Sequence, residues 1–275
     1  MDLSTDPESV QLLSDSVRSA MSATSGAKLD AALADLGWRD MLDEIPDVAI
    51  PLVFRLLGET GAHAPVLNDV VLGADERGPD GTVPLPFAGG CWVVWKRTDG
   101  TGPAIDDELP IHRVGQGDSV PPAALAAGRL ALGWWLVGTS RAMLSLARQH
   151  AVDRVQFGRH ISSFQAIRHR LAETLVAIEG AEATLLAAGD IRDPDESHAL
   201  ACLLAKAAAG QAALTAARHC QQVLGGIGFT VEHHLHRHVK RSLVLDGLLG
   251  SARELTQEAG ALLRVKGSAP RLAQL

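Results

Sequence analysis

The sequence predicts a mainly α-helical protein in which a short region of strands and loops separates two helical parts. Apolar residues recur at three- and four-residue steps before about residue 72 and after about residue 119, as a buried helix face requires. Glycine, proline and aspartate punctuate the segment between them. The 275 residues are 47% hydrophobic, which is ordinary for a globular protein with a full core. We therefore expect an N-terminal helical domain (1–72), a reduced middle β region (73–118) and a C-terminal four-helix bundle (119–275).

Three apolar faces in the N-terminal region predict three helices. The first face contains Val10, Leu13, Val17 and Met21, and the second contains Leu29, Leu33 and Leu36, with Gly37 ending it. The third runs from Ile50 to Leu57, and we expect Gly58 to stop it because glycine disfavours helix interiors.

The middle region changes character. Turn-forming sequences occur at 77–82 (RGPDGT), 87–90 (FAGG) and 98–103 (TDGTGP). Between the last two, Cys91–Trp95 is a short apolar run with two tryptophans and two valines, which predicts a β-strand. We expect a few short strands and loops here.

The C-terminal region predicts a bundle of helices joined by short links. The first helix should run from about Pro122 to Asp153. The second carries Ile167, Leu171, Leu175 and Ile178 on one face, and a loop at Asp190–Ser197 follows it. A third, alanine-rich helix should reach Leu224 and break at Gly225–Gly228. A fourth should follow beyond Phe229, near Leu245–Val265.

Composition argues against several partners. The net charge is -7 and the 25 Lys and Arg residues are scattered, so no basic surface for nucleic acid is expected. The opening MDLSTDPESV is too acidic for a signal or transit peptide, and the richest apolar run, Leu130–Val137, is too short to span a membrane. Cys91, Cys202 and Cys220 are too dispersed for a disulfide framework or a zinc site. We expect a cytoplasmic protein without nucleic-acid or membrane partners.

Two distant segments carry the most specific signal. Asp153–Gln165 reads DRVQFGRHISSFQ, and Gln222–Phe229 reads QVLGGIGF. An arginine can hold a pyrophosphate through its planar donors, and adjacent glycines let backbone N–H groups approach a phosphate. Taken alone, each segment could also be an ordinary helix end with a glycine cap. Together and in this order, they resemble the flavin-contacting signatures R-x-x-F-G-x-x-I-x-x-F-Q and Q-x-x-G-G-x-G-[FY] of acyl-CoA dehydrogenases.

The resemblance implies a binding site for FAD that is shared between subunits. In that family both segments contact the ADP half of a flavin whose ring lies in the neighbouring subunit. The residues that match the contacting positions are Arg154, Gln156, Phe157, Ile161, Phe164, Gln165, Gln222, Val223, Gly225 and Gly226. The family also places a substantial β domain around the ring, and this chain has room for only a remnant of it.

The resemblance also implies that the catalytic base is missing. In the family a glutamate in a Y-E-G-T-like motif removes the substrate α-proton, and the matching residue here is Leu249. Some members place the glutamate before a retained arginine instead, and the matching residues are Gly128 and Arg129. If the register slips, Asp246 is the alternative base.

For the other residues that could form a site, the sequence favours a structural role over a functional one. His234 and His238 are four residues apart and could pair on a metal, but no cysteine or suitable carboxylate has matching spacing, so we expect a solvated or subunit-facing segment and no metal site. Trp134 and Trp135 should lie in the core or an interface. Ser162 and Ser163 lack the context of a nucleophile.

The leading hypothesis is therefore the non-catalytic subunit of a heteromeric acyl-CoA dehydrogenase, with an α2β2 assembly sharing FAD at its interface. A second subunit would carry the β domain and the catalytic glutamate, and the pair would desaturate an acyl-CoA. Paired short subunits of this kind occur in actinobacterial steroid side-chain degradation, which suggests a steroid-type thioester. The alternatives are a flavin-free helical scaffold and a self-sufficient dehydrogenase that uses Asp246.

Overall fold

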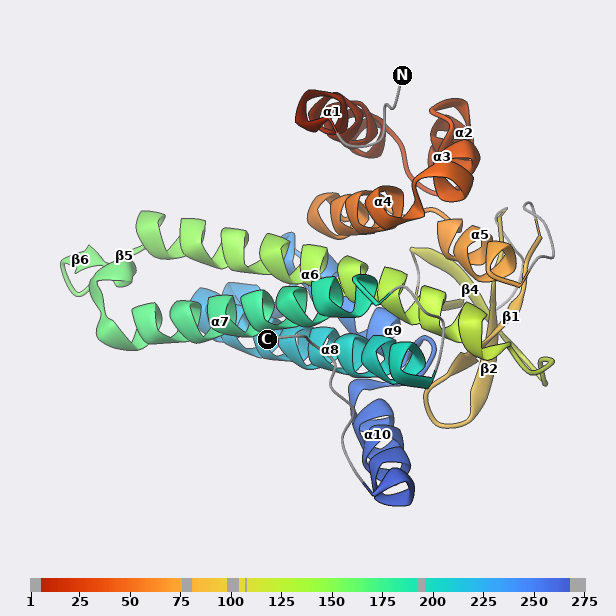
Figure 1. The fold of residues 1–275 in the computed structure, drawn as a ribbon. Helices are drawn as coiled ribbons and strands as arrows, with labels where there is room; N and C mark the ends of the chain where they lie inside the picture. Colours follow the sequence, from red (N-terminus) through yellow and green to blue (C-terminus); the bar gives the residue numbers. More distant parts are fainter. Residues whose placement is uncertain (1–5, 76–80, 98–103, 107, 192–195, 268–275) are drawn as a thin grey trace.

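The computed structural model describes residues 6–75, 81–97, 104–106, 108–191 and 196–267. A long helical bundle carries a stack of N-terminal helices on one side and a small sheet at one end (Figure 1). The α-helices are α1 (Pro7–Ala23), α2 (Ala27–Asp35), α3 (Trp38–Glu44), α4 (Pro46–Thr60), α5 (Val66–Gly73), α6 (Pro122–Asp153), α7 (Gln165–Gly189), α8 (Glu196–Leu224), α9 (Leu235–Gly247) and α10 (Ala252–Lys266). The mainly α fold class is confirmed.

The N-terminal region contains two helices that the apolar pattern does not predict, α3 and α5. The prediction that Gly58 ends a helix is wrong, because α4 continues to Thr60 and ends at Gly61, which has a left-handed backbone (φ 73°). Gly58 has a packing role instead. A Cβ added at Gly58 would lie 2.4 Å from the carbonyl oxygen of Trp135, and one at Gly138 would lie 2.1 Å from that of Arg55. Glycine at both positions lets α4 and α6 cross with their backbones in close approach.

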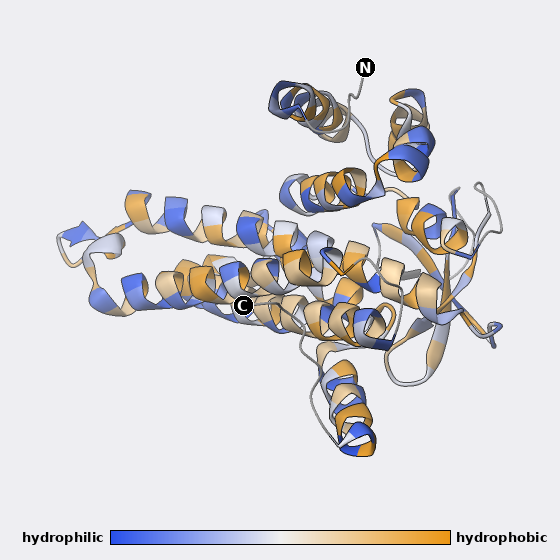
Figure 2. Ribbon diagram, in the orientation of Figure 1, coloured by the Kyte–Doolittle hydropathy of each residue, from blue (hydrophilic) through white to orange (hydrophobic). Residues whose placement is uncertain are grey.

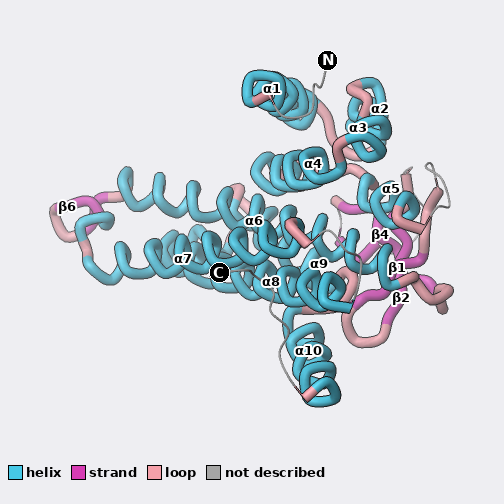
Figure 3. Tube along the Cα trace, in the orientation of Figure 1, coloured by secondary structure: helices cyan, strands magenta, loops and turns pink. Residues whose placement is uncertain are grey.

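The strands form a four-stranded antiparallel sheet in the order β1–β2–β4–β3. They are β1 (Pro84–Phe87), β2 (Cys91–Trp95), β3 (Ala104–Asp106) and β4 (Leu109–Val114). The predicted strand at Cys91–Trp95 is confirmed as β2. Figure 3 shows this sheet at one end of the bundle, opposite the short strands β5 (Val155–Gln156) and β6 (Arg159–His160). The turn segments at 77–82 and 98–103 lie largely outside the described residues.

The bundle is built from α6, α7, α8 and α9. The predicted bounds of the first helix are confirmed by α6. The predicted fourth helix is in fact two, because Leu248–Ser251 separates α9 from α10. Leu175 does not share the buried face of Ile178, since its side chain is 43% exposed. Residues 192–195 of the predicted Asp190–Ser197 loop lie outside the described residues.

One hydrophobic core runs through all three regions. It joins Val17 of α1, Trp95 of β2 and Leu249 in a single cluster of buried residues. Trp135 of α6 stacks on Trp95 with ring centroids 5.4 Å apart, and Trp134 is also buried, which confirms the prediction of a core position. Figure 2 shows that α8 is largely hydrophobic whereas the tip of the bundle around β6 is hydrophilic. The segment Glu196–Phe229 is apolar and long enough to cross a membrane, but 67% of its most apolar window is buried, as in a core helix.

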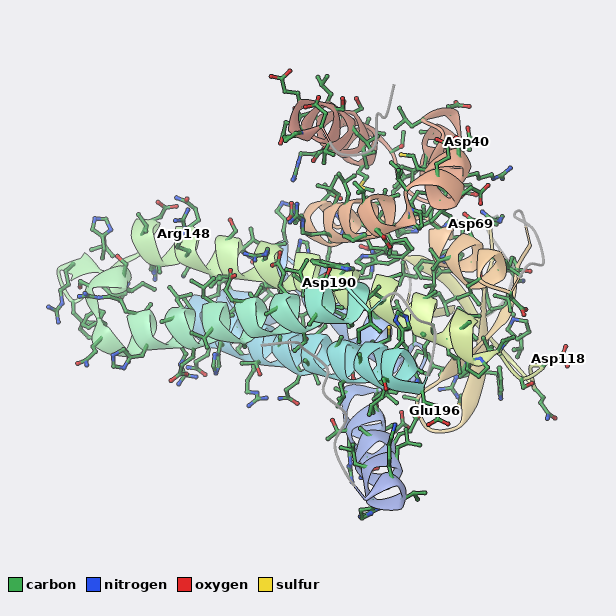
Figure 4. The ribbon with its side chains drawn as sticks, in the orientation of Figure 1. Asp40, Asp69, Asp118, Arg148, Asp190 and Glu196 are labelled. Atoms are coloured by element: carbon green, nitrogen blue, oxygen red, sulfur yellow. The ribbon has the colours of Figure 1, made fainter. Side chains whose placement is uncertain are left out.

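An ion-pair network joins the N-terminal helices to the sheet. Arg97 follows β2 and pairs with Asp30 at 3.0 Å and with Asp69, whose carboxylate also accepts a hydrogen bond from Trp38 Nε1 at 3.1 Å. Asp69 lies on α5 below the N-terminal helices in Figure 4. Burial raises its pKa, and the charge of Arg97 opposes that shift. The network fixes the sheet against α2, α3 and α5.

Candidate functional site

A tight hairpin at the tip of the bundle carries the first segment. The chain leaves α6 at Arg154, whose N–H donates to the carbonyl of His150 at 2.9 Å. Strands β5 and β6 then pair around a two-residue turn, Phe157–Gly158. Both turn residues have positive φ, 54° and 71°, as the favoured hairpin turns require. A phenylalanine at positive φ is uncommon and points to a functional constraint.

The hairpin presents an aromatic surface. Phe157 is 90% exposed and makes an edge-to-face contact with Phe164, with ring centroids 6.1 Å apart. The guanidinium of Arg159 lies 4.3 Å from the centroid of the Phe164 ring. A strained, almost fully exposed phenylalanine indicates a surface that another molecule covers.

The polar side chains of this segment are available to a ligand. Arg154 and Gln156 are exposed, and the side chain of Arg154 has no hydrogen bond or ion pair within the described part of the chain. Gln165 begins α7, is exposed, and lies 3.4 Å from His169 Nε2. The free planar donors of Arg154 fit the chemistry of a pyrophosphate.

The second segment ends α8 and begins a 3₁₀ turn at Gly225–Phe229. Gly225 has φ 65°, so a glycine is needed there, and the predicted helix break is confirmed. No atom lies within 4 Å of a Cβ added at Gly225 or Gly226, so both backbones face open space. Gln222 is exposed and Val223 is buried.

The structure brings the two segments to the same end of the bundle. Ile161 packs against a buried cluster that contains Val223 and Leu224. Arg148, labelled in Figure 4, lies on the part of α6 that leads to this tip. The tip therefore combines free guanidinium donors, an exposed aromatic ring and open glycine backbones.

The two matched base positions also meet in space, far from the tip. A Cβ added at Gly128 would lie 2.6 Å from Cδ1 of Leu249, so the Leu249 side chain fills the space above Gly128. Leu249 is 1% exposed and has φ 55°, and its N–H donates to the carbonyl of Pro86 at 2.8 Å. Arg129 Nε donates to the Leu249 carbonyl at 3.2 Å, while Nη2 of Arg129 pairs with Glu258 at 3.3 Å. Neither matched position carries a carboxylate.

Asp246 lies one helical turn before Leu249 and is held inside the protein. It is buried, and Oδ1 accepts a hydrogen bond from the N–H of Ala252 at 3.0 Å. A Cβ added at Gly210 would lie 2.2 Å from the same oxygen, so α8 closes over the carboxylate. This carboxylate serves the start of α10 and faces α8.

Lys206 supports the loop that carries Leu249 and was not predicted from the sequence. It is fully buried on α8, and Nζ donates to the carbonyls of Asp246 and Gly250. Burial lowers its pKa to about 7 against the opposing charge of Asp246. The sequence feature that could have identified Lys206 is the position of a lysine on the apolar face of an alanine-rich helix.

The histidine segment contains no metal site in the described part of the chain, where no group of three or more His, Cys, Asp and Glu side chains is arranged to hold a metal. The prediction of a solvated or subunit-facing segment is wrong for one member, because His238 is buried within the chain itself and is only 9% exposed. It points inward because it lies three residues after Leu235 and seven before Leu245, on the buried face of α9.

Residues 115–256 match the family described as "Acyl-CoA dehydrogenase, C-terminal domain". The chain belongs to the acyl-CoA dehydrogenase family. Over 119 residues it is 39% identical to the acyl-CoA dehydrogenase IpdE2 of Mycobacterium tuberculosis, covering 43% of this chain and 36% of that protein. It is 37% identical over 127 residues to the acyl-CoA dehydrogenase FadE34 of the same organism, covering 46% of this chain and 18% of FadE34. The matched part is about a third or less of these relatives' length.

Solved structures share the fold over nearly the whole acyl-CoA dehydrogenase-like chain. One is the steroid ACAD Tcur3481–Tcur3483 (G363A variant), with a TM-score of 0.70 and 20% identity over 95% of this chain and 99% of that one. Another is the ChsE4–ChsE5 complex of Mycobacterium tuberculosis, with a TM-score of 0.66 and 20% identity over 98% of this chain and 100% of that one. Acyl-CoA dehydrogenases in general are oxidoreductases that use FAD.

Proposed function

We propose that this chain is the non-catalytic subunit of a heteromeric acyl-CoA dehydrogenase, which works in the cytoplasm as an α2β2 assembly. It supplies the ADP-binding half of a shared FAD site, and a second acyl-CoA dehydrogenase-like subunit supplies the β domain and the catalytic glutamate. The observation that carries the proposal is the filled base position. Leu249 covers Gly128 with an apolar side chain, and neither residue can accept a proton.

A base is useful only within hydrogen-bond reach of the proton that it removes. The carboxylates nearest in sequence are already engaged. Asp246 is buried beneath α8 and bound to the N–H of Ala252. Glu254 accepts hydrogen bonds from the N–H groups of Gly89 and Ser251, and Glu258 pairs with Arg129. The alternative of a self-sufficient dehydrogenase would need Asp246 to leave these contacts.

The residues at the tip fit the proposed cofactor half. Arg154 would hold the pyrophosphate, Phe157 would lie against the adenine, and the backbone N–H groups at Gly225 and Gly226 can approach the ligand closely. These residues would hold the ADP half of FAD, which would supply the hydride acceptor for the desaturation. The retention of an exposed Phe157 and an unengaged Arg154 argues against the flavin-free scaffold, which would gain nothing from either.

A steroid-type acyl-CoA is the proposed substrate class. It rests on the resemblance of the chain to a protein described as a steroid ACAD and on its likeness to a two-component complex. In this proposal the substrate binds in the partner subunit, because Leu249 fills the corresponding space here.

The proposal is tested by co-expressing this chain with the second acyl-CoA dehydrogenase-like subunit that carries the β domain and the catalytic glutamate. We expect a stable complex that carries flavin absorbance, whereas the chain purified alone should bind FAD poorly because its sheet cannot wall the ring. A stoichiometric flavin band in the chain alone would sink the proposal.

A further inference from the structure

A polar cleft between α1, α4, α6 and α9 lies outside both family segments and is here called the α4–α9 cleft. Its volume is about 620 Å³. Its lining is rich in donors and charges, chiefly Arg18, Glu59, Arg141, Ser145, Arg237 and His238. The proposed function uses none of these residues.

His238 is the buried polar group of this cleft. Its ring is 9% exposed and makes no hydrogen bond with another described residue. Gly61 forms the adjacent wall and has no side chain to cover the ring. A Cβ there would lie 3.4 Å from Cε1 and 3.7 Å from Nε2 of His238. A buried imidazole without a partner normally costs free energy, so its open edge calls for a ligand or solvent in the cleft.

Three arginines line the same cleft, and each has N–H groups that are not used within the described chain. Arg18 pairs with Glu59 through Nη2 (2.7 Å), and Arg237 pairs with Glu108 through Nε (3.0 Å). Arg141 pairs with Glu182 through Nε (3.2 Å) and with Glu179 through Nη2 (3.0 Å). In each arginine, Nη1 has no partner within the described chain. The carboxylates hold the guanidinium groups in place while leaving these N–H groups free for a further acceptor.

We propose that the α4–α9 cleft binds a phosphate group, as inorganic phosphate or as the monoester of a small metabolite. Guanidinium donors from three elements, the hydroxyl of Ser145 and the open edge of His238 surround one space. A carboxylate offers two oxygens to such a set, whereas a phosphate offers three or four and can engage several guanidinium groups together.

The electrostatics of the cleft agree with an anionic ligand. Burial, together with the charges of Arg241, Arg237 and His234, lowers the pKa of His238 to about 4 against the opposing effect of Glu108. The other charged groups that line the cleft are Arg18, Glu59 and Arg141. A bound anion would offset the positive field and raise the pKa of His238.

The test is a phosphate titration of the full chain at pH 7 and constant ionic strength, followed by the NMR signals of the histidine rings. We expect a saturable shift of the His238 signal and a rise of its pKa. Glycerol phosphate in a parallel titration distinguishes a monoester from inorganic phosphate, and acetate reports on carboxylates. Arg237→Gln and Arg18→Gln should each weaken binding at least tenfold, while Arg253→Gln on the exposed face of α10 should not.

Several results would overturn the inference. They are a shift that follows ionic strength alone, an equal response to acetate, and a binding curve that Arg237→Gln and Arg18→Gln leave as unchanged as Arg253→Gln does. Because both tested arginines are partly exposed, neither variant should unfold the chain. FAD binding and turnover in the heteromeric complex are separate readouts, so failure here leaves the proposed function standing.

Discussion

Leu249 combines a left-handed backbone with a buried apolar side chain that cannot accept a proton. Its left-handed backbone is held from both sides, by the hydrogen bond to Pro86 and by the one from Arg129. Such a conformation costs of order 1–3 kcal/mol and persists only where the surroundings determine it. These hydrogen bonds therefore hold the loop in its left-handed conformation.

We predict that Leu249→Glu creates no dehydrogenase activity in this chain alone. The new carboxylate would be buried against Gly128 with neither a thioester nor a flavin ring opposite it. It should also destabilise the fold by several kcal/mol, whereas the volume-conserving Leu249→Met should cost less than about 1.5 kcal/mol. Turnover by the isolated Leu249→Glu chain would contradict the proposed division of labour.

Replacing Asp246 by asparagine should leave the turnover of the complex nearly intact. Its carboxylate caps the start of α10 and does not face a substrate, so the change should appear in the denaturation midpoint instead. The check is steady-state turnover of the complex with FAD bound. A fall of about a hundredfold or more, the low end for loss of a general base, would move the base into this chain.

Arg154→Ala in the complex should weaken FAD binding and not the chemical step. Removing one partner of a charged contact costs about 2–5 kcal/mol, and the exposure of Arg154 favours the low end, or about thirtyfold in Kd. Turnover should recover at high FAD. Arg148→Ala, at an exposed arginine on the same helix, is the control and should leave the Kd unchanged.

Lys206 should make stability depend on pH. Its folded pKa of about 7 lies below its usual value of 10.5, so between these limits the unfolded chain binds more protons. Stability from this group therefore rises with pH from about 7 to 10.5 and is lost as pH falls toward 7, at up to about 1.4 kcal/mol per pH unit. Urea denaturation at several pH values, compared with Lys206→Met, should show this slope in the wild type only.

The contact between α4 and α6 depends on glycine at its centre. Gly138→Ala should destabilise the protein by about 1–3 kcal/mol or more, because the new methyl group would meet the backbone of Arg55. Gly180→Ala on α7 is the matched control, since a Cβ there meets nothing and alanine favours helix by about 1 kcal/mol. Equal effects in thermal denaturation would contradict this account of the crossing.

At the scale of elements, periodicity located most helices but not their ends. It predicted α6 to the residue, because a proline start and a break at Arg154 coincide with the apolar pattern. It failed at Gly58 because a glycine that permits close packing looks the same in sequence as one that ends a helix. It missed the break between α9 and α10, which depends on tertiary hydrogen bonds from Leu249 and Ala88.

The candidate site shows the same division. The local spacing of residues in the sequence predicted the residues at the tip and the two matched base positions that carry no carboxylate. Sequence spacing alone cannot show which residues meet when distant helices pack. It therefore does not predict that the two matched base positions are in contact, that Lys206 supports their loop, or that His238 is buried.

For the whole molecule, the core cluster that joins the N-terminal helices, the sheet and the bundle has a consequence for unfolding, although two further clusters lie at the tip and beside α10. Because α1, the sheet and Leu249 share one cluster, we expect one cooperative unfolding transition and not stepwise loss of domains. Fluorescence of the buried tryptophans and far-ultraviolet circular dichroism should report the same midpoint. Two separated midpoints would show that the sheet unfolds independently.

The length of α6 sets the distance between the matched base positions and the tip of the bundle. Gly128 and Asp153 both lie on this helix, 25 residue steps apart. At a rise of 1.5 Å per residue, about 38 Å separates the position that Leu249 covers from the tip of the bundle. That distance exceeds the reach of one extended flavin dinucleotide, so no single cofactor can serve both places in the same chain. In the proposed assembly, the ring of a flavin held at this tip would therefore lie against the neighbouring subunit.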